Sequence, residues 1–162
     1  MQFWFAILLF SLITRLMALA TSGRSTTWDS NVLQTLLGKA ALTAPAGAYA
    51  ALYSAVPTAD NGTFTELTGG GYARATIDAA NAAAAWSATT TDATGVWKTN
   101  AAQVSFPAAS AGWTAATGFA VCAAATAGVA DIIYWGTFAS ATTVGSGATA
   151  SFAAGALKIT EA

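Results

Sequence analysis

Histidine is absent from the sequence, and only one cysteine, Cys122, is present. The commonest general base and the usual zinc ligand are therefore missing, and the lone thiol has no imidazole to activate it. One cysteine also excludes an intrachain disulfide, and its position in the apolar stretch GFAVCAAA predicts a small buried residue. No G-x-S-x-G nucleophile elbow occurs either. We therefore expect no catalytic residue and a protein that is not an enzyme.

Charged side chains are also scarce: six basic and seven acidic residues make up 8% of the 162-residue chain, and its net charge is −1. In ordinary soluble domains about a quarter of the residues are charged. A folded chain of 16.2 kDa exposes about 7,500 Å², so these few charges cover only a minor part of the surface. Wide neutral faces suit a protein that is covered by copies of itself or by a neighbour. The basic residues form no stripe that could follow a phosphate backbone, so we expect no nucleic-acid partner.

The acidic residues show no spacing that is typical of catalysis or of a metal site. In the stretch DNGTFTE, Asp60, Asn61 and Glu66 could offer oxygen ligands, but their spacing does not match an EF-hand loop. We interpret this stretch as a turn. The other acids are spread along the chain, and nothing indicates a glycosidase-like carboxylate pair. We expect no metal, no cofactor and no small-molecule substrate.

The first 20 residues form a separate apolar segment, MQFWFAILLFSLITRLMALA. Its apolar run is broken by Thr14 and Arg15 and is shorter than the roughly 20 residues that cross a bilayer. A secretory signal normally has its basic residues before the apolar run, and here they follow it. Three interpretations stay open: a signal, a short interface helix, or upstream sequence before a true start at Met17.

A short helix is predicted over residues 30–37, within an N-terminal arm of residues 21–44. Asp29 is the predicted N-cap, and Gly38 stands where a glycine commonly ends a helix. The apolar residues of this helix share one face: Val32, Leu33, Leu36 and Leu37. Such a face packs either on its own domain or on sister helices around a symmetry axis.

From residue 45 to residue 162 the hydrophobic pattern has a period of two, which predicts one β domain. The predicted strands are 48–56, 72–78, 102–108, 118–125, 131–138, 149–155 and 156–160. Four tryptophans supply bulk that an alanine-rich sheet lacks, and we expect them in the core or at an interface: Trp86, Trp97, Trp113 and Trp135. The predicted fold is mainly β, a jelly-roll-like antiparallel sandwich preceded by one short α-helix.

Three consecutive glycines, Gly69, Gly70 and Gly71, precede the stretch YARATI. A phosphate-binding loop would need a helix after the glycines and Lys-Ser/Thr directly behind the last one, and neither is present. Tyr72 and Arg74 instead alternate with alanines, as in a strand. We predict a turn with positive φ that leads into the sheet, with Arg74 paired to an acid or bound to a carbonyl.

The stretch YAALYSAVPTADNGTFTELTGGGYARATI resembles the signature of small virion proteins of tailed bacteriophages, a family of head decoration and tail-fibre-like proteins. The resemblance continues through VSFPAASAGWTAATGFAVCAAATAG, IYWGTF and SGATASFAAGALKIT, and it covers about residues 29–160. Family members begin shortly before the short helix, which supports Met17 as the start. The resemblance implies a structural role in the particle, with no catalytic residues to carry over.

These observations predict a non-enzymatic virion protein, in the first place a capsid decoration or cement protein that stabilises the head by binding the major capsid protein. The second candidate is a tail-fibre-like or host-contact tail protein, with other tail proteins as partners. A third is a secreted bacterial adhesin or carbohydrate-binding module, which would need a genuine signal at the N-terminus. The neutral surface, the apolar helix face and the tryptophans predict a homo-oligomer. The resemblance suggests a trimer.

Overall fold

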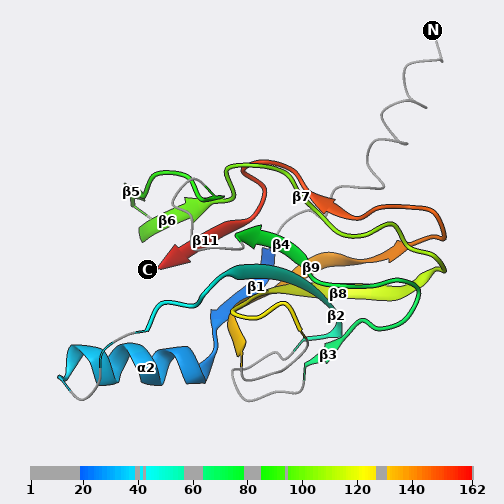
Figure 1. Cartoon of the computed structure of the whole chain (residues 1–162). Helices are drawn as coiled ribbons and strands as arrows, with labels where there is room; N and C mark the ends of the chain where they lie inside the picture. The colour runs from blue at the N-terminus through cyan, green and yellow to red at the C-terminus, as the bar shows by residue number, and fades with distance from the viewer. Residues whose placement is uncertain are drawn as a thin grey trace, which may run out of the picture.

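The structure is a computed structural model that describes residues 19–38, 41, 43–56, 64–78, 85–93, 95–126 and 131–161, without the side chains of residues 19–22. In these ranges the elements follow as β1 (Leu19–Arg24), α2 (Thr26–Leu36), β2 (Ala48–Ala55), β3 (Thr65–Glu66), β4 (Ala75–Asp78), β5 (Thr90–Asp92), β6 (Gly95–Thr99), β7 (Val104–Ser105), β8 (Trp113–Cys122), β9 (Ile132–Val144), β10 (Ser151–Phe152) and β11 (Lys158–Glu161). Figure 1 shows their arrangement. All pairings among these strands are antiparallel.

The largest sheet has six strands in the order β1-β9-β8-β2-β3, with β4 beside β2. Strand β2 lies inside this sheet, and its residues from Ala50 to Tyr53 are at most 2% exposed. Because neighbouring side chains of a strand point to opposite faces, this burial means that both faces of the sheet are covered. The small alanine side chains let the covering layers approach the strand closely.

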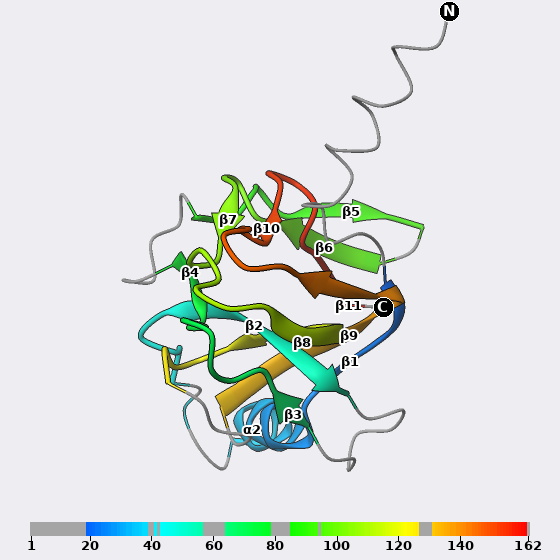
Figure 2. The ribbon, with the colours of Figure 1, turned by 90° about the vertical axis from the view of Figure 1, so that its right-hand side faces the viewer.

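Two smaller sheets form a second layer over one face of the large sheet: β11-β6-β5 and β10-β7. Figure 2 shows them above the strands of the large sheet. An aromatic group fills the space between the layers, with ring centroids 5.3 to 6.4 Å apart: Tyr72, Phe106, Trp113, Phe119, Phe138 and Phe152. The predicted fold class is confirmed: the protein is mainly β, antiparallel and sandwich-like, with one short helix.

A smaller apolar cluster covers the opposite face of the large sheet. Tyr53 and Trp135 flank Phe64, with ring centroids 5.5 and 6.2 Å from it. Cys122 lies in this cluster with no exposed surface. Burial raises the pKa of its thiol to about 12, so the thiol stays protonated at neutral pH. This agrees with the prediction of a small buried residue rather than a reactive one.

Helix α2 differs from the prediction at its beginning. It starts at Thr26 instead of residue 30, and the N-cap is Ser25, whose hydroxyl accepts a hydrogen bond from the Trp28 N–H at 3.4 Å. Asp29 is not the N-cap, because it lies inside the first turn and pairs with Arg24. The end is as expected, since Gly38 follows the C-cap residue with φ of +69°.

Several strands also differ from the predicted ranges. The arm predicted over residues 21–44 contains the last four residues of β1, which pairs with β9 in the large sheet, so a strand precedes the helix. The strand predicted over 72–78 is confined to β4, Ala75–Asp78. The β5–β6 hairpin had no predicted counterpart. The predicted turn at Asp60 and Asn61 and most of the apolar segment 1–20 lie outside the described residues.

Candidate interaction surfaces

Helix α2 carries an apolar stripe that the described part of the chain leaves exposed. We call Val32, Leu33, Leu36 and Leu37 the leucine stripe. Leu33 is 58% exposed, Leu36 75% and Leu37 74%, and Val32 is half-buried. No residue of α2 is buried, and the helix extends away from the sheets at one side of the molecule (Figure 1). The stripe is therefore available to another copy or to a partner.

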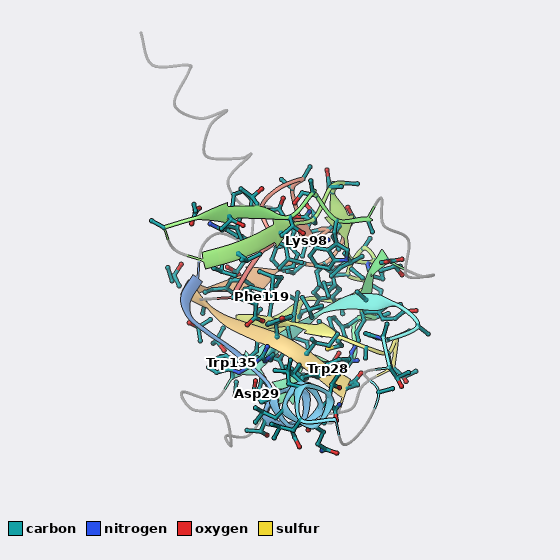
Figure 3. All side chains as sticks on the ribbon, turned by 90° about the vertical axis from the view of Figure 1, so that its left-hand side faces the viewer. Trp28, Asp29, Lys98, Phe119 and Trp135 are labelled. Carbon is teal, nitrogen blue, oxygen red and sulfur yellow. The ribbon has the colours of Figure 1, made fainter. Side chains whose placement is uncertain are left out.

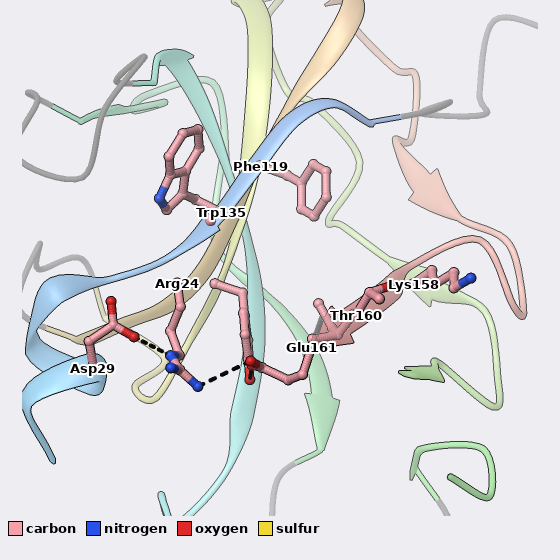
Figure 4. A pocket seen from close by; sticks show the side chains of 10 residues that line it. Arg24, Asp29, Phe119, Trp135, Lys158, Thr160 and Glu161 are labelled. Atoms are coloured by element: carbon pink, nitrogen blue, oxygen red, sulfur yellow. Dashed lines mark hydrogen bonds and ion pairs between the residues drawn. The ribbon is translucent and has the colours of Figure 1, made fainter. Parts of the chain in front are cut away.

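The base of α2 is tied to the sheets by a chain of polar contacts (Figure 4). Arg24 at the end of β1 pairs with Asp29 in the helix and, at 3.2 Å, with Glu161 in β11. Glu161 also accepts a hydrogen bond from the hydroxyl of Tyr134 in β9. The hydrogen bond to Asp29 raises the pKa of Arg24. The pKa of Tyr134 is raised to about 12, mainly by burial and to a smaller extent by the hydrogen bond to Glu161. These contacts fix the direction in which the helix leaves the sheets.

A cavity of about 390 Å³ opens beside these contacts, between β1 and β11. Both strands are edges: β1 pairs only with β9, and β11 only with β6, within the described residues. Phe119 and Trp135 reach this cavity from the two sides of β1 (Figure 4). The indole N–H of Trp135 is buried without a hydrogen-bond partner among the described residues. Arg24, Lys158 and Glu161 contribute charged groups to the lining of this cavity.

A second cavity of about 390 Å³ lies next to the first and shares Tyr134, Ile159 and Glu161 with it. We call it the apolar hollow. Its apolar walls come from both layers: Trp86, Val96, Val121, Ile133 and Ile159. Asp78, Lys98 and Glu161 add polar groups. Figure 3 places Lys98 in the layer opposite to Phe119 and the helix residues Trp28 and Asp29.

The strand pairing explains how the β6–β11 layer contributes to the hollow. Ile159 is paired with Lys98, and Glu161 with Val96. Directly paired residues point to the same face of a sheet, so these four side chains share one face. Val96 is 44% exposed although it is apolar. The hollow therefore has an apolar residue at an open position, which a single soluble domain seldom needs.

Arg74 lies in a buried ion cluster on another part of the large sheet. Its guanidinium binds both carboxylate oxygens of Glu66 at 2.8 Å, pairs with Asp131 and donates to the Ala124 carbonyl at 2.8 Å. Its side chain is 1% exposed. Burial alone would lower the pKa of Arg74, but the bonds to Glu66 and Asp131 outweigh it and raise the pKa. Tyr72 joins the cluster through its hydroxyl, 3.1 Å from Glu66. These contacts tie the chain beside β3 to the chain before β9, although the second carboxylate oxygen of Asp131 is buried without a hydrogen-bond partner among the described residues.

The three glycines form the predicted turn with positive φ, at +75°, +54° and +74° for Gly69, Gly70 and Gly71. The Gly70 carbonyl accepts hydrogen bonds from the Trp113 indole N–H at 2.9 Å and from the Ser110 N–H at 2.8 Å. The turn thus holds the segment before β8 against the large sheet. Tyr72 and Arg74 follow it as irregular chain, not as the strand that the alternation predicted.

The four tryptophans occupy different places. Trp113 and Trp135 are buried, one between the layers and one on the opposite face of the large sheet. Trp86 is half-buried and packs against the main core. Trp97 is half-buried too, with its N–H donated to Asp92 at 2.8 Å and the Lys158 ammonium 4.4 Å from its ring centroid. Two of the four therefore line the apolar hollow and two fill cores.

Sequence reasoning did not anticipate Arg24, Tyr134 and Glu161 as a group, since no local pattern joins residues so far apart. Among the described residues, no three potential metal ligands of the His, Cys, Asp and Glu types lie together. Within the same ranges, no helix has the length and apolar character needed to span a bilayer.

A comparison with protein families identifies a match over most of the chain. The family model described as Podophage GP4 fiber I protein gp80 matches residues 23–160. The match begins in β1 and ends in β11, so it spans both layers and the helix. A search of curated proteins found no match.

Proposed function

Since the chain belongs to the Podophage GP4 fiber I protein gp80 family, a family of tailed-phage virion proteins, we propose that it is a tail-fibre-like protein of the phage particle. The family match over residues 23–160 is the observation that carries this proposal. It favours the tail-fibre-like candidate over the capsid decoration protein, which was the first choice from the sequence. The location in the virion follows from the family, and the position at the tail is the proposed part.

The proposed role is structural and not enzymatic. In the described residues, four of the acids are engaged in ion pairs: Glu66 and Asp131 with Arg74, and Asp29 and Glu161 with Arg24. General acid and base catalysis needs a carboxyl group that can exchange protons with a bound substrate. These acids instead connect strands, a helix and loops. The arrangement supports a rigid module with no small-molecule substrate.

We propose that the protein works as a homo-oligomer, with a trimer as the working model. The exposed leucine stripe supports self-association, because three of its residues keep more than half of their surface in water. Asp29 is the single charged residue in α2, and it is already paired with Arg24. Identical helices therefore meet no charge repulsion when they approach one another. Other tail proteins are the proposed further partners.

The location and copy number of the protein in purified particles test this function. Quantitative mass spectrometry against the major capsid protein would give the number, and antibody labelling of intact particles in the electron microscope would give the place. We expect a small copy number and label at the tail. Hundreds of copies with label over the head would establish decoration instead. Absence from the particle would overturn the proposal altogether.

A further inference from the structure

We propose that the cavity between β1 and β11 and the apolar hollow together bind a saccharide that has no net charge. The two cavities measure about 390 Å³ each and share Tyr134, Ile159 and Glu161, so they adjoin between the large sheet and the β6–β11 layer. We call this pair of cavities the groove. The inference goes beyond the proposed function, because it assigns a ligand to the chain itself, wherever the protein is located in the particle.

The groove contains many of the charged residues of a chain that has few. Three of the six basic and three of the seven acidic residues line it: Arg24, Lys98, Lys158, Asp29, Asp78 and Glu161. Among the other charged residues that the structure describes, Glu66, Arg74 and Asp131 form the buried ion cluster, and the remaining one is Asp92 in β5. The groove is therefore the part of this weakly charged molecule that is best equipped to recognise a polar ligand.

The balance of these charges indicates that the ligand is neutral. In the apolar hollow, an anionic group would lie near the carboxylates of Asp78 and Glu161, and a cationic group would lie near the ammonium of Lys98. Like charges brought together in this way oppose binding. A hydroxyl group meets no such conflict, because it accepts a hydrogen bond from a cation and donates one to a carboxylate. The lining therefore fits a neutral ligand with several hydroxyl groups.

The apolar part of the lining favours a sugar among such ligands. Trp86, Val96 and Ile159 line the hollow beside the charged groups, and Trp86 is half-buried, with part of its surface still accessible. A sugar ring has a face of C–H groups and a rim of hydroxyls. The C–H groups pack on an aromatic ring, whose face carries partial negative charge. One sugar ring can thus use the apolar wall and the charged rim at the same time.

The size of the cavities favours a few sugar units over a protein surface. Each volume of about 390 Å³ lies within the roughly 300–1,000 Å³ of small-molecule sites, whereas a stable protein interface takes about 800 Å² from each partner. The edge strands β1 and β11 offer backbone groups to an extended peptide. A peptide bound in this way pairs backbone with backbone and leaves the charged groups of the hollow unused. Two adjoining cavities instead suit a short oligosaccharide.

The polar groups at the junction of the two cavities are held in place by contacts within the protein. Glu161 accepts a hydrogen bond from the hydroxyl of Tyr134 and pairs with Arg24 (Figure 4). Lys98 is exposed and forms no ion pair with the residues that the structure describes. A ligand therefore meets a carboxylate that is already oriented, which lowers the entropy lost on binding.

Binding of the full chain to an array of neutral oligosaccharides tests this inference. The array carries trisaccharides of glucose, galactose, mannose, rhamnose and N-acetylglucosamine, with oligogalacturonate as the acidic counterpart. Isothermal titration calorimetry then measures the affinity for the trisaccharide that binds best. Binding in about 50 mM and about 500 mM sodium chloride should differ less than about twofold, because a neutral ligand forms no ion pair that salt would screen.

Two variants test whether the groove is the site. Val96→Arg fills the hollow from an exposed position, and Trp86→Leu keeps an apolar side chain but removes the aromatic ring. The matched controls are Thr143→Arg, at an exposed position of β9, and Trp28→Leu, at a half-buried tryptophan that lines neither cavity. Thermal denaturation shows which variants are folded. Because Val96 is exposed, Val96→Arg tests the site even if Trp86→Leu fails to fold.

We expect Val96→Arg and Trp86→Leu each to weaken binding at least about tenfold, and both controls to bind like the wild type. Absence of binding to every neutral trisaccharide would overturn the inference, and so would full binding by Val96→Arg. A preference for oligogalacturonate that disappears in salt would show that the ligand is anionic, which contradicts the inference as well. None of these outcomes bears on the proposed function, which depends on the place and copy number of the protein in the particle.

Discussion

Arg24 and Glu161 lie 137 positions apart in the chain, and their side chains form an ion pair with an Nη1–Oε2 distance of 3.2 Å. Arg24 ends β1 and Glu161 ends β11, so the pair joins the edge strand of the large sheet to an edge strand of the other layer. Because Arg24 also pairs with Asp29, one guanidinium group determines where α2 leaves the two layers.

Replacing this guanidinium should loosen the helix more than it destabilises the fold. Arg24 and Glu161 are 30% and 47% exposed, and ion pairs at such exposure contribute about 0–1 kcal/mol. We therefore expect Arg24→Gln to lower the free energy of unfolding by no more than about 1 kcal/mol. Amide hydrogen exchange over residues 26–36 should become faster, while exchange in β8 stays unchanged. Lys158→Gln is the control, and unchanged exchange in α2 would contradict the prediction.

Removing Arg74 should have a much larger effect on stability. Its side chain is 1% exposed and is the partner of Glu66 and Asp131, which would both lose their cation. Breaking a buried ion pair by removing one partner costs about 3–5 kcal/mol. We expect a loss of this size for Arg74→Met in urea denaturation, and less than about 1 kcal/mol for Lys98→Met at an exposed position. Equal losses for the two variants would show that the cluster does not stabilise the fold.

In the glycine turn, alanine substitutions at two neighbouring positions should cost different amounts of stability. Both Gly69 and Gly70 have positive φ, but a Cβ at Gly70 would lie 2.7 Å from the Ala111 carbonyl oxygen, and one at Gly69 would meet nothing within 4 Å. Gly69→Ala should therefore cost about 1 kcal/mol, from the backbone conformation alone. Gly70→Ala should cost clearly more, because the chain before β8 must move as well. Chemical denaturation of the two variants measures the difference, and a larger loss for Gly69→Ala would be inconsistent with this turn.

The raised pKa of the Tyr134 hydroxyl predicts that the protein loses stability at alkaline pH. Burial and the bond to Glu161 raise its pKa to about 12 from an ordinary value of 10.0. A raised pKa in the folded state favours the protonated form, so this contribution is fully present below pH 10.0 and is lost as the pH rises through about 12. We expect the difference in unfolding free energy between the wild type and Tyr134→Phe to shrink across this interval. A constant difference would mean that the hydroxyl ionises equally easily in both states.

Local patterns predicted the parts of the fold that depend on neighbouring residues. The alternation in AYAALYSAV placed β2 within one residue of its observed end, and the glycine run indicated the turn with positive φ. Strand β1 was missed because LATSGR has no alternation of its own, and it forms a strand only where β9 supplies its partner. The start of α2 was misplaced because Ser25 and Asp29 are both good caps, and the pairing of Asp29 with Arg24 decides between them.

The interaction surfaces were predictable only in part. The spacing of Leu33, Leu36 and Leu37 predicted one apolar face, but its exposure depends on which elements pack on α2, and spacing does not contain this information. The hollow is formed by six strands and two connecting segments, so no short stretch indicates it. The contact between Arg24 and Glu161 likewise exists only after both layers have formed.

The near absence of charge on α2 determines how contacts made by this helix respond to temperature and ionic strength. Sodium chloride screens interactions between charges, and Asp29, the single charged group of the helix, is already neutralised by Arg24. The attraction between apolar side chains weakens on cooling. If the proposed homo-oligomer forms through α2, its contacts should tolerate a wide range of salt concentrations and weaken in the cold, so particles kept on ice should lose this protein more readily than particles kept at room temperature.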